Sequence, residues 1–304
     1  MTSGLCLLEA GHSVSIWAKE LPPNTTSNRA AAIWYPYKAD APEISEWGLK
    51  AYQTFKRLRS VQESGVIWAD MLEVKAEASP ENPWWATIVD GFRHARPQEL
   101  PSGYVDGYLF EVPVIDTSIY LDYLVQTVQA QGGQIRQHTI SNLAEAFAQS
   151  AIVVNCSGLG ARELVGDRDL HASRGQVVRV KHNGFRLSLL DHDRPEEVTY
   201  IVPRVNDIVL GGTDEEYNES TATDAEQTRD ILRRCAKLAP QFANIAPADI
   251  LSIVCGLRPV RSTVRVEAER VAPDHLLIHN YGHGGAGITL SWGCAAEVVE
   301  LVGQ

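Results

Sequence analysis

The stretch LLIHNYGHGGAGIT, residues 276–289, decides the fold class. It begins as an apolar strand at Leu276–His279, passes through the glycine-dense turn Gly282–Gly287, and leads into a helix predicted from about Thr289 to Val302. A strand, a tight turn and a helix in this order present backbone N–H groups and a helix N-terminus to an anion or a polarised carbonyl. Glycine turns before helices are common, so tight packing alone is an alternative. Either way, the stretch predicts an α/β unit near the end of the chain.

Two further segments extend this α/β pattern. The start of the chain predicts a helix at Ser3–Ala10, ended by Gly11, and then a strand at Ser13–Ala18. The apolar run Ala151–Cys156 is typical of a buried parallel strand. Between these segments, residues 66–120 and 176–210 contain short strand patterns and turns. The chain is therefore predicted to have α/β pieces at its start, middle and end, interleaved with a mostly β part.

The size and charge of the chain exclude several classes of protein. Its 304 residues suit two interlocked domains with large cores. A formal net charge of -11 argues against nucleic acid or an anionic membrane surface as a partner, and no apolar run is long enough to span a membrane. Neither a signal peptide nor a peroxisomal tripeptide is recognisable at the ends. We therefore expect a cytoplasmic protein.

The cysteines and histidines show no spacing typical of a metal site, so no metal is expected. A reducing compartment favours free and mostly buried thiols over a structural disulfide. The five cysteines are Cys6, Cys156, Cys235, Cys255 and Cys294.

Three motifs could carry chemistry. In GLRPVR, residues 256–261, two arginines flank a rigid proline, and a guanidinium fork can bind both oxygens of a carboxylate. The alternative is a structural arginine paired with a nearby acid. Tyr200 begins a predicted strand, from which its hydroxyl could point into a cleft or simply pack in the core. Ser157 follows a buried strand, but the GxSxG pattern of a nucleophile elbow is absent, so a hydrolase is a poor fit.

Six short segments, taken together and in order along the chain, resemble those of the D-amino-acid oxidase family. The resemblance rests on the segments Ala30–Tyr37, Asn155–Gly158, Arg174–Gln176, Gly256–Arg261, Tyr281–Thr289 and Ser291–Ala295. It implies a Rossmann-like FAD-binding domain, formed by residues 1–37, 120–175 and 255–304. Residues 38–119 and 176–254 would form a mostly antiparallel β (α+β) substrate-binding domain.

The resemblance also implies a function and a substrate site. The chain would oxidise D-amino acids to 2-oxo acids, ammonia and hydrogen peroxide, by hydride transfer to FAD with O2 as acceptor and with no catalytic acid or base. Arg261 would bind the substrate α-carboxylate, Tyr200 would donate its hydroxyl to the same group, and the Gly285 carbonyl would receive the amine. A homodimer is compatible with the resemblance.

Cofactor contacts are implied along the whole chain. Thr25 and Thr26 would approach the pyrophosphate, and Lys19 and Glu20, at the end of the second strand, would approach the ribose. Ile140, Cys156, Ser157 and Gly158 would lie near the adenosine. The isoalloxazine ring would lie between two groups of residues, Ala31, Ala32 and Ile33 on one side and Gly284, Gly285, Ala286, Gly287, Ile288 and Thr289 on the other.

The sequence departs from the family pattern at two places. Where some members have a second active-site tyrosine four residues before the first, this chain has Glu196. Where others place it after Gly-Gly-Thr, this chain has Asp214, with Tyr217 close enough to serve instead. D-aspartate oxidases tend to have arginine at that position. Because Asp214 would repel an acidic side chain, we expect neutral or basic D-amino acids as substrates.

Two alternatives remain open at this point. Glycine or sarcosine oxidase is the near alternative within the same flavin class. The other is a non-catalytic homologue, because the strand and Gly-x-Gly-x-x-Gly loop that anchor the pyrophosphate in the family would precede Thr2. Retained flavin colour would distinguish the catalytic interpretation from the non-catalytic one.

Overall fold

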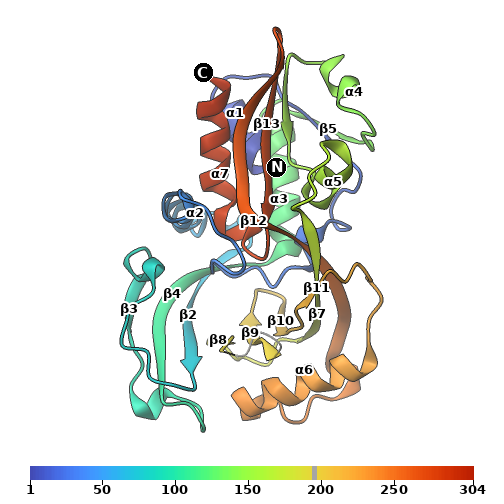
Figure 1. Cartoon of the computed structure of the whole chain (residues 1–304). Helices are drawn as coiled ribbons and strands as arrows, with labels where there is room; N and C mark the ends of the chain where they lie inside the picture. Colours follow the sequence, from blue (N-terminus) through green and yellow to red (C-terminus); the bar gives the residue numbers. More distant parts are fainter. Residues whose placement is uncertain (194–196) are drawn as a thin grey trace.

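In the computed structural model, which describes residues 1–193 and 197–304, the elements gather in two lobes joined by one long sheet (Figure 1). The helices are α1 (Thr2–Glu9), α2 (Ile44–Leu58), α3 (Thr117–Ala130), α4 (Leu143–Phe147), α5 (Ala161–Leu164), α6 (Ala225–Leu238) and α7 (Gly287–Val302). The strands are β1 (Ser15–Ala18), β2 (Val66–Lys75), β3 (Asp90–His94), β4 (Asp106–Ile115), β5 (Gln134–Gln137), β6 (Ile152–Asn155), β7 (His171–Lys181), β8 (Ser188–Asp191), β9 (Thr199–Pro203), β10 (Asp207–Gly211), β11 (Glu215–Glu216), β12 (Ile250–Ala272) and β13 (His275–His283).

The large sheet has the strand order β3-β4-β2-β8-β9-β10-β7-β12-β13-β6, with β11 paired to β7. Most neighbours are antiparallel, but β6 runs parallel to β13, β8 runs parallel to β2, and β1 forms a separate parallel pair with β5. The parallel pairs β6–β13 and β1–β5 lie in the lobe with α1, α3 and α7, while the mostly antiparallel strands β2 to β4 and β8 to β10 lie in the other lobe with α6 (Figure 1). This arrangement confirms the predicted α/β fold with an interleaved, mostly antiparallel part.

Strand β12 connects the two lobes. Its residues Ile250–Val260 pair with β7, and from Val260 to Ala272 it pairs with β13, with a shift in register after Val260. The GLRPVR motif lies where the partner changes. The motif is therefore held between the two lobes by neighbouring strands on both sides.

Helix ends follow the expected capping chemistry. The Asp116 side chain accepts a hydrogen bond from the Ser118 N–H at the start of α3, and Asp224 caps α6 in the same way. Gly11 follows α1 with a φ of 88°, a conformation that favours glycine. These local signals explain why α1 ends, and why α3 and α6 begin, where they do.

Close packing fixes α2 against α7. A Cβ atom placed on Gly293 of α7 would lie 2.2 Å from the backbone oxygen of Trp47 in α2. Helix α2 belongs to the range 38–119 that was predicted to bind substrate, yet it packs on α7 of the predicted cofactor-binding part. The exact domain boundaries therefore stay a prediction.

All five cysteines are free, as predicted. Among the described residues, no helix has the length and apolar character needed to cross a membrane.

Candidate functional site

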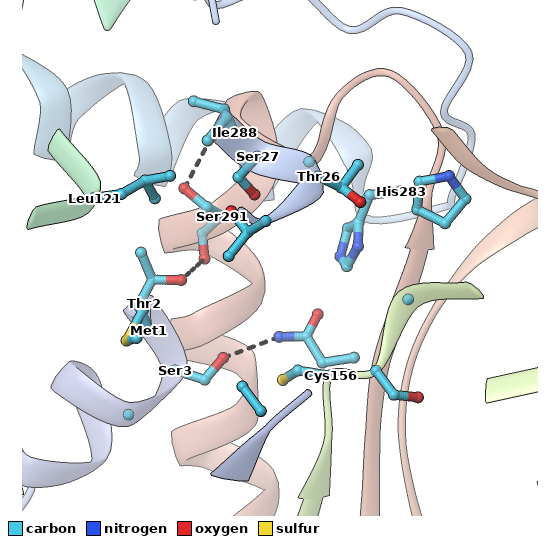
Figure 2. Close-up of a pocket in the computed structure, with 18 of the residues that line it drawn as sticks. Met1, Thr2, Ser3, Thr26, Ser27, Leu121, Cys156, His283, Ile288 and Ser291 are labelled. Carbon is cyan, nitrogen blue, oxygen red and sulfur yellow. Dashed lines mark hydrogen bonds between the residues drawn. The ribbon is translucent and has the colours of Figure 1, made fainter. Parts of the chain in front are cut away.

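A single large cavity contains most of the predicted site residues. Its volume is about 1710 Å³, and it extends from β1 along the loop before Tyr37 to the glycine turn and the sheet of the other lobe. Predicted residues that line it are Lys19, Glu20, Thr25, Thr26, Ala31, Ala32, Ile33, Ile140, Cys156, Ser157, Gly158, Tyr200, Gly284, Gly285, Gly287 and Ile288. Figure 2 shows Thr26, Cys156, His283 and Ile288 meeting from different parts of the chain. Residues spread over 270 positions of sequence therefore face one space.

Four predicted residues do not line this cavity in the described chain: Arg261, Tyr217, Ala286 and Thr289. Tyr217 is 76% exposed and stacks on His171, with ring centroids 4.2 Å apart. Ala286 is buried as the N-cap of α7. The Thr289 hydroxyl accepts a hydrogen bond from the Tyr35 N–H and donates one to the Tyr35 carbonyl. Ala286 and Thr289 thus hold the turn and the facing loop together, whereas Tyr217 lies at the surface.

The placement of Arg261 does not support its predicted role. Its Nε lies 3.0 Å from Oδ2 of Asp167, and its Nη1 donates to the carbonyl of Thr263. Arg258, three residues earlier in β12, lines the cavity instead. Side chains alternate between the two faces of a strand, so residues three apart point to opposite sides. Of the two arginines in the motif, Arg258 is therefore the one that faces the cavity in the described structure.

Glycines make room for Arg258 and for Tyr200 beside it. A Cβ on Gly175 would lie 2.4 Å from Nη2 of Arg258, and one on Gly211 would lie 2.1 Å from the Tyr200 ring. Arg258 also hydrogen-bonds the Tyr200 side chain, while burial raises the pKa of Tyr200. The tyrosine therefore stays protonated at neutral pH, so a cation and a phenol lie side by side in the cavity wall. This arrangement suits a carboxylate ligand.

Asp214 lies behind this pair. Its carboxylate accepts a hydrogen bond of 2.7 Å from the Tyr37 hydroxyl, forms an ion pair of 2.6 Å with Lys38, and also bonds Ser173. Burial raises the pKa of Asp214, but these hydrogen bonds and nearby Arg258 outweigh the burial and hold the pKa below its ordinary value of 3.8. The charge of Asp214 is thus balanced within the protein. The prediction that Asp214 repels an acidic substrate therefore has no support. Glu196, the other departure from the family pattern, lies outside the described residues.

The glycine turn is pressed against the loop that carries Tyr37. A Cβ on Gly284 would lie 1.9 Å from the Lys38 oxygen, and one on Gly285 would lie 2.5 Å from the Tyr37 ring. The turn then leads into α7, whose first residues Gly287 and Ile288 line the cavity. The first N–H groups of a helix have no carbonyl partner within that helix. The cavity wall at this end therefore presents the positive end of a helix to an electron-rich carbonyl.

Other features fit a large polar cofactor. Asn155 and Asn280 both line the cavity, and Nδ2 of the first and Oδ1 of the second are buried without a hydrogen-bond partner among the described residues. Buried polar atoms are rarely left unpaired in a native protein, so such atoms mark where a ligand can bind. Burial lowers the pKa of His283, also in the wall, to about 4, which keeps its ring neutral at neutral pH. The residues present therefore fit FAD.

Sequence reasoning missed several cavity residues. Arg258 stood in the recognised motif GLRPVR, but choosing it over Arg261 needed the pairing of the strand that carries the motif. Asn155 stood in a recognised motif but was not assigned a contact. Tyr35, Tyr37 and His283 also line the cavity, and no local pattern indicates that they do.

A glycine turn at a helix N-terminus, combined with an arginine and a tyrosine in the same cavity, is typical of a cofactor-dependent enzyme that binds a carboxylate. The family model described as "DAO: FAD dependent oxidoreductase" matches residues 1–301. The chain therefore belongs to the DAO family of FAD-dependent oxidoreductases.

Individual relatives agree with this assignment. The chain is 42% identical over 304 residues to a D-amino-acid oxidase of Rubrobacter xylanophilus, covering 100% of this chain and 92% of that relative. It is 41% identical over 310 residues to a D-amino-acid oxidase of Dictyostelium discoideum, covering 100% and 88%. The solved glycine oxidase of Geobacillus kaustophilus has the same fold, with a TM-score of 0.79, 17% identity and coverage of 99% and 91%.

Proposed function

We propose that this protein catalyses the FAD-dependent oxidative deamination of D-amino acids, neutral or basic, to 2-oxo acids, ammonia and hydrogen peroxide. The observation that carries the proposal is the Arg258–Tyr200 pair, which faces the same cavity as the glycine turn before α7. Relatives at 41% and 42% identity that are D-amino-acid oxidases support the choice of substrate.

Within this site, the protein binds and orients the substrate. Arg258 binds the α-carboxylate through its guanidinium fork, and Tyr200 donates its hydroxyl to the same group. The Gly285 carbonyl receives the amine, which leaves Cα between the pair and the turn. Hydrogen bonds to a charged group contribute about 1.5–3 kcal/mol each. FAD supplies the hydride acceptor and the route to O2, so the chain itself needs no acid or base beyond this orientation.

The cofactor contacts are proposed on the same basis. Ala31, Ala32 and Ile33 line the same cavity as the glycine turn, and Thr25 and Thr26 begin the short helical turn Thr26–Arg29. We assign Thr25 and Thr26 to the pyrophosphate and Lys19 and Glu20 to the ribose. The adenosine end is assigned to Ile140, Cys156, Ser157 and Gly158.

The test compares the two arginines of the motif. Arg258→Ala should raise KM for D-alanine by about tenfold to a hundredfold, the range that 1.5–3 kcal/mol produces. Arg261→Ala is the matched control, because it removes the same side chain from the opposite face of β12. Peroxide release measures activity, and flavin absorbance verifies that FAD is bound. An unchanged KM in Arg258→Ala with a strong rise in Arg261→Ala would contradict the assignment.

A substrate panel tests the choice of substrate. D-Alanine, D-lysine, D-aspartate, glycine and sarcosine would be compared by kcat/KM. Glycine or sarcosine as the best substrate would favour the amine-oxidase alternative. D-Aspartate as the best substrate would contradict the preference for neutral or basic side chains.

We also propose a cytoplasmic location and a homodimer. The five free cysteines support a reducing compartment. Light scattering of the purified protein would measure its oligomeric state, and a monomer at micromolar concentration would contradict the homodimer.

A further inference from the structure

Strand register places a buried carboxylate on the substrate side of the sheet. Gly211 of β10 pairs with Tyr200 of β9, Tyr200 pairs with Leu190 of β8, and Leu190 pairs with Glu73 of β2. Directly paired residues project to the same face of a sheet. Neighbouring strands are about 4.8 Å apart, so Glu73 lies two strands, or about 10 Å, from Tyr200 on that face. These paired residues therefore form a line across the sheet from Tyr200, in the proposed carboxylate site, to Glu73.

Tyr35 stands between the cavity and Glu73. Tyr35 lines the cavity, and its hydroxyl donates a hydrogen bond of 3.1 Å to Oε2 of Glu73. The Glu73 side chain is 2% exposed, so substrate would meet Tyr35 first. The cavity wall around Tyr35 is apolar and includes Met71, Leu190 and Val198. A substrate side chain would thus run along apolar groups and end at the Tyr35 hydroxyl.

The carboxylate of Glu73 determines the direction in which the Tyr35 hydroxyl donates its hydrogen bond. An ionised carboxylate only accepts hydrogen bonds, so the Tyr35 proton is directed toward Glu73. The phenol oxygen then has only lone pairs left for the cavity. The end of the cavity is therefore a hydrogen-bond acceptor.

Among the residues that the structure describes, negative charge predominates at this end of the cavity. There, Lys75 forms ion pairs with Glu73 at 2.7 Å and with Asp193 at 3.1 Å, so two described carboxylates share one ammonium. His192 lies 3.4 Å from both Glu73 and the Tyr35 hydroxyl, and burial lowers its pKa, so it adds no charge at neutral pH. A side chain ending in a cation is therefore favoured here over one ending in a carboxylate.

We propose that Tyr35, held by Glu73, determines side-chain specificity and favours D-amino acids whose long side chain ends in a cationic donor, as in D-lysine. Tyr35 touches the substrate, and Glu73 is a positioning residue that acts through it. This inference rests on the proposed function. The sequence attributed the preference for basic substrates to Asp214. The structure attributes it instead to the Tyr35 hydroxyl oxygen, which accepts a hydrogen bond at the far end of the cavity.

The test compares D-lysine with D-norleucine, which has a similar chain length and no ammonium group. The measured quantity is the ratio of kcat/KM for the two substrates in the FAD-loaded enzyme. Tyr35→Phe removes the acceptor, and Glu73→Gln removes the charge that directs it. Both variants should lower the ratio by about tenfold or more, mainly through KM for D-lysine. Asp70→Asn is the matched control, because it removes an exposed carboxylate from the same strand and should leave the ratio unchanged.

The outcomes separate this inference from the proposed function. If D-norleucine is oxidised normally and the ratio is unchanged in Tyr35→Phe, the specificity role is overturned while the oxidase function stands. If the yellow wild-type enzyme oxidises neither substrate nor D-alanine, the proposed function itself fails. Should Glu73→Gln not fold without its partner for Lys75, Tyr35→Phe decides the question alone.

Discussion

Gly175 lies directly against the guanidinium group of Arg258, so that a Cβ atom at this position would lie 2.4 Å from Nη2 and 2.6 Å from Cζ. The two residues are on adjacent antiparallel strands, with Gly175 paired to Gly256. A side chain of any size on β7 at this point would occupy the space of the guanidinium. The glycine of the Arg-Gly-Gln segment is therefore explained by the position of the arginine in the next strand.

Gly175→Ala should consequently impair substrate binding more than stability. The atoms that the new methyl group meets are the end of a flexible side chain, which can move aside at small cost to folding. The displaced guanidinium would lose its position beside Tyr200, and KM for D-alanine should rise about tenfold, as for loss of one charged hydrogen bond. Peroxide kinetics and a thermal melt measure the two effects. Gly160→Ala serves as control, since its nearest contact outside the chain neighbours would be 3.4 Å.

Gly293→Ala is expected to show the opposite pattern. The added Cβ would lie 2.2 Å from the oxygen and 2.3 Å from the Cα of Trp47, and these backbone atoms cannot rotate away. Helices α2 and α7 would have to separate, at a cost of about 1–3 kcal/mol in the free energy of unfolding. Denaturant unfolding measures this loss. Gly303→Ala, just beyond the last residue of α7, has no contact closer than 3.5 Å and should be neutral; equal stability of the two variants would refute the packing argument.

Sequence patterns predict those elements whose apolar spacing and capping residues lie within the element itself. Apolar periodicity and capping residues are enough to place α6, where Ile231, Cys235 and Leu238 are buried on one side. Strand β12 has no such continuous pattern in the sequence, although it runs from Ile250 to Ala272. It passes from one lobe to the other and changes partner, so its buried face changes and no single alternation extends along it.

The candidate site likewise has features that the sequence predicts and features that depend on strand pairing. The glycine turn was predicted because strand, glycines and helix are adjacent in sequence. The choice between Arg258 and Arg261 needed the strand assignment of β12, which its pattern did not reveal. Contacts such as that of Tyr35 with Glu73 join residues 38 positions apart through the pairing of several strands, and no local periodicity encodes them.

Asp214→Asn should destabilise the protein in a pH-dependent way. The pKa of Asp214 is held below its ordinary value in the folded state, because hydrogen bonds and ion pairs outweigh its burial. A lowered folded pKa contributes stability that is present above the unfolded value of about 3.9 and is lost as pH falls below it. The variant should therefore melt at a lower temperature than wild type at pH 7, and the difference should shrink below about pH 4. A constant difference from pH 7 to pH 3 would show that the Asp214 charge does not stabilise the fold.

His283 should make the stability of the protein fall in mild acid. Burial lowers its pKa to about 4 in the folded state, whereas an unfolded histidine titrates near 6.5. Between these values the unfolded chain binds a proton that the folded chain does not, so the free energy of unfolding decreases as pH falls from about 6.5 to about 4. His283→Gln removes this contribution, and its stability should depend less steeply on pH in that window while following wild type above it. Urea unfolding at pH 5, 6, 7 and 8 measures the slope, with the exposed His12→Gln as control. The same slope in His283→Gln and wild type would mean that the His283 ring takes up its proton equally well in the folded and unfolded states.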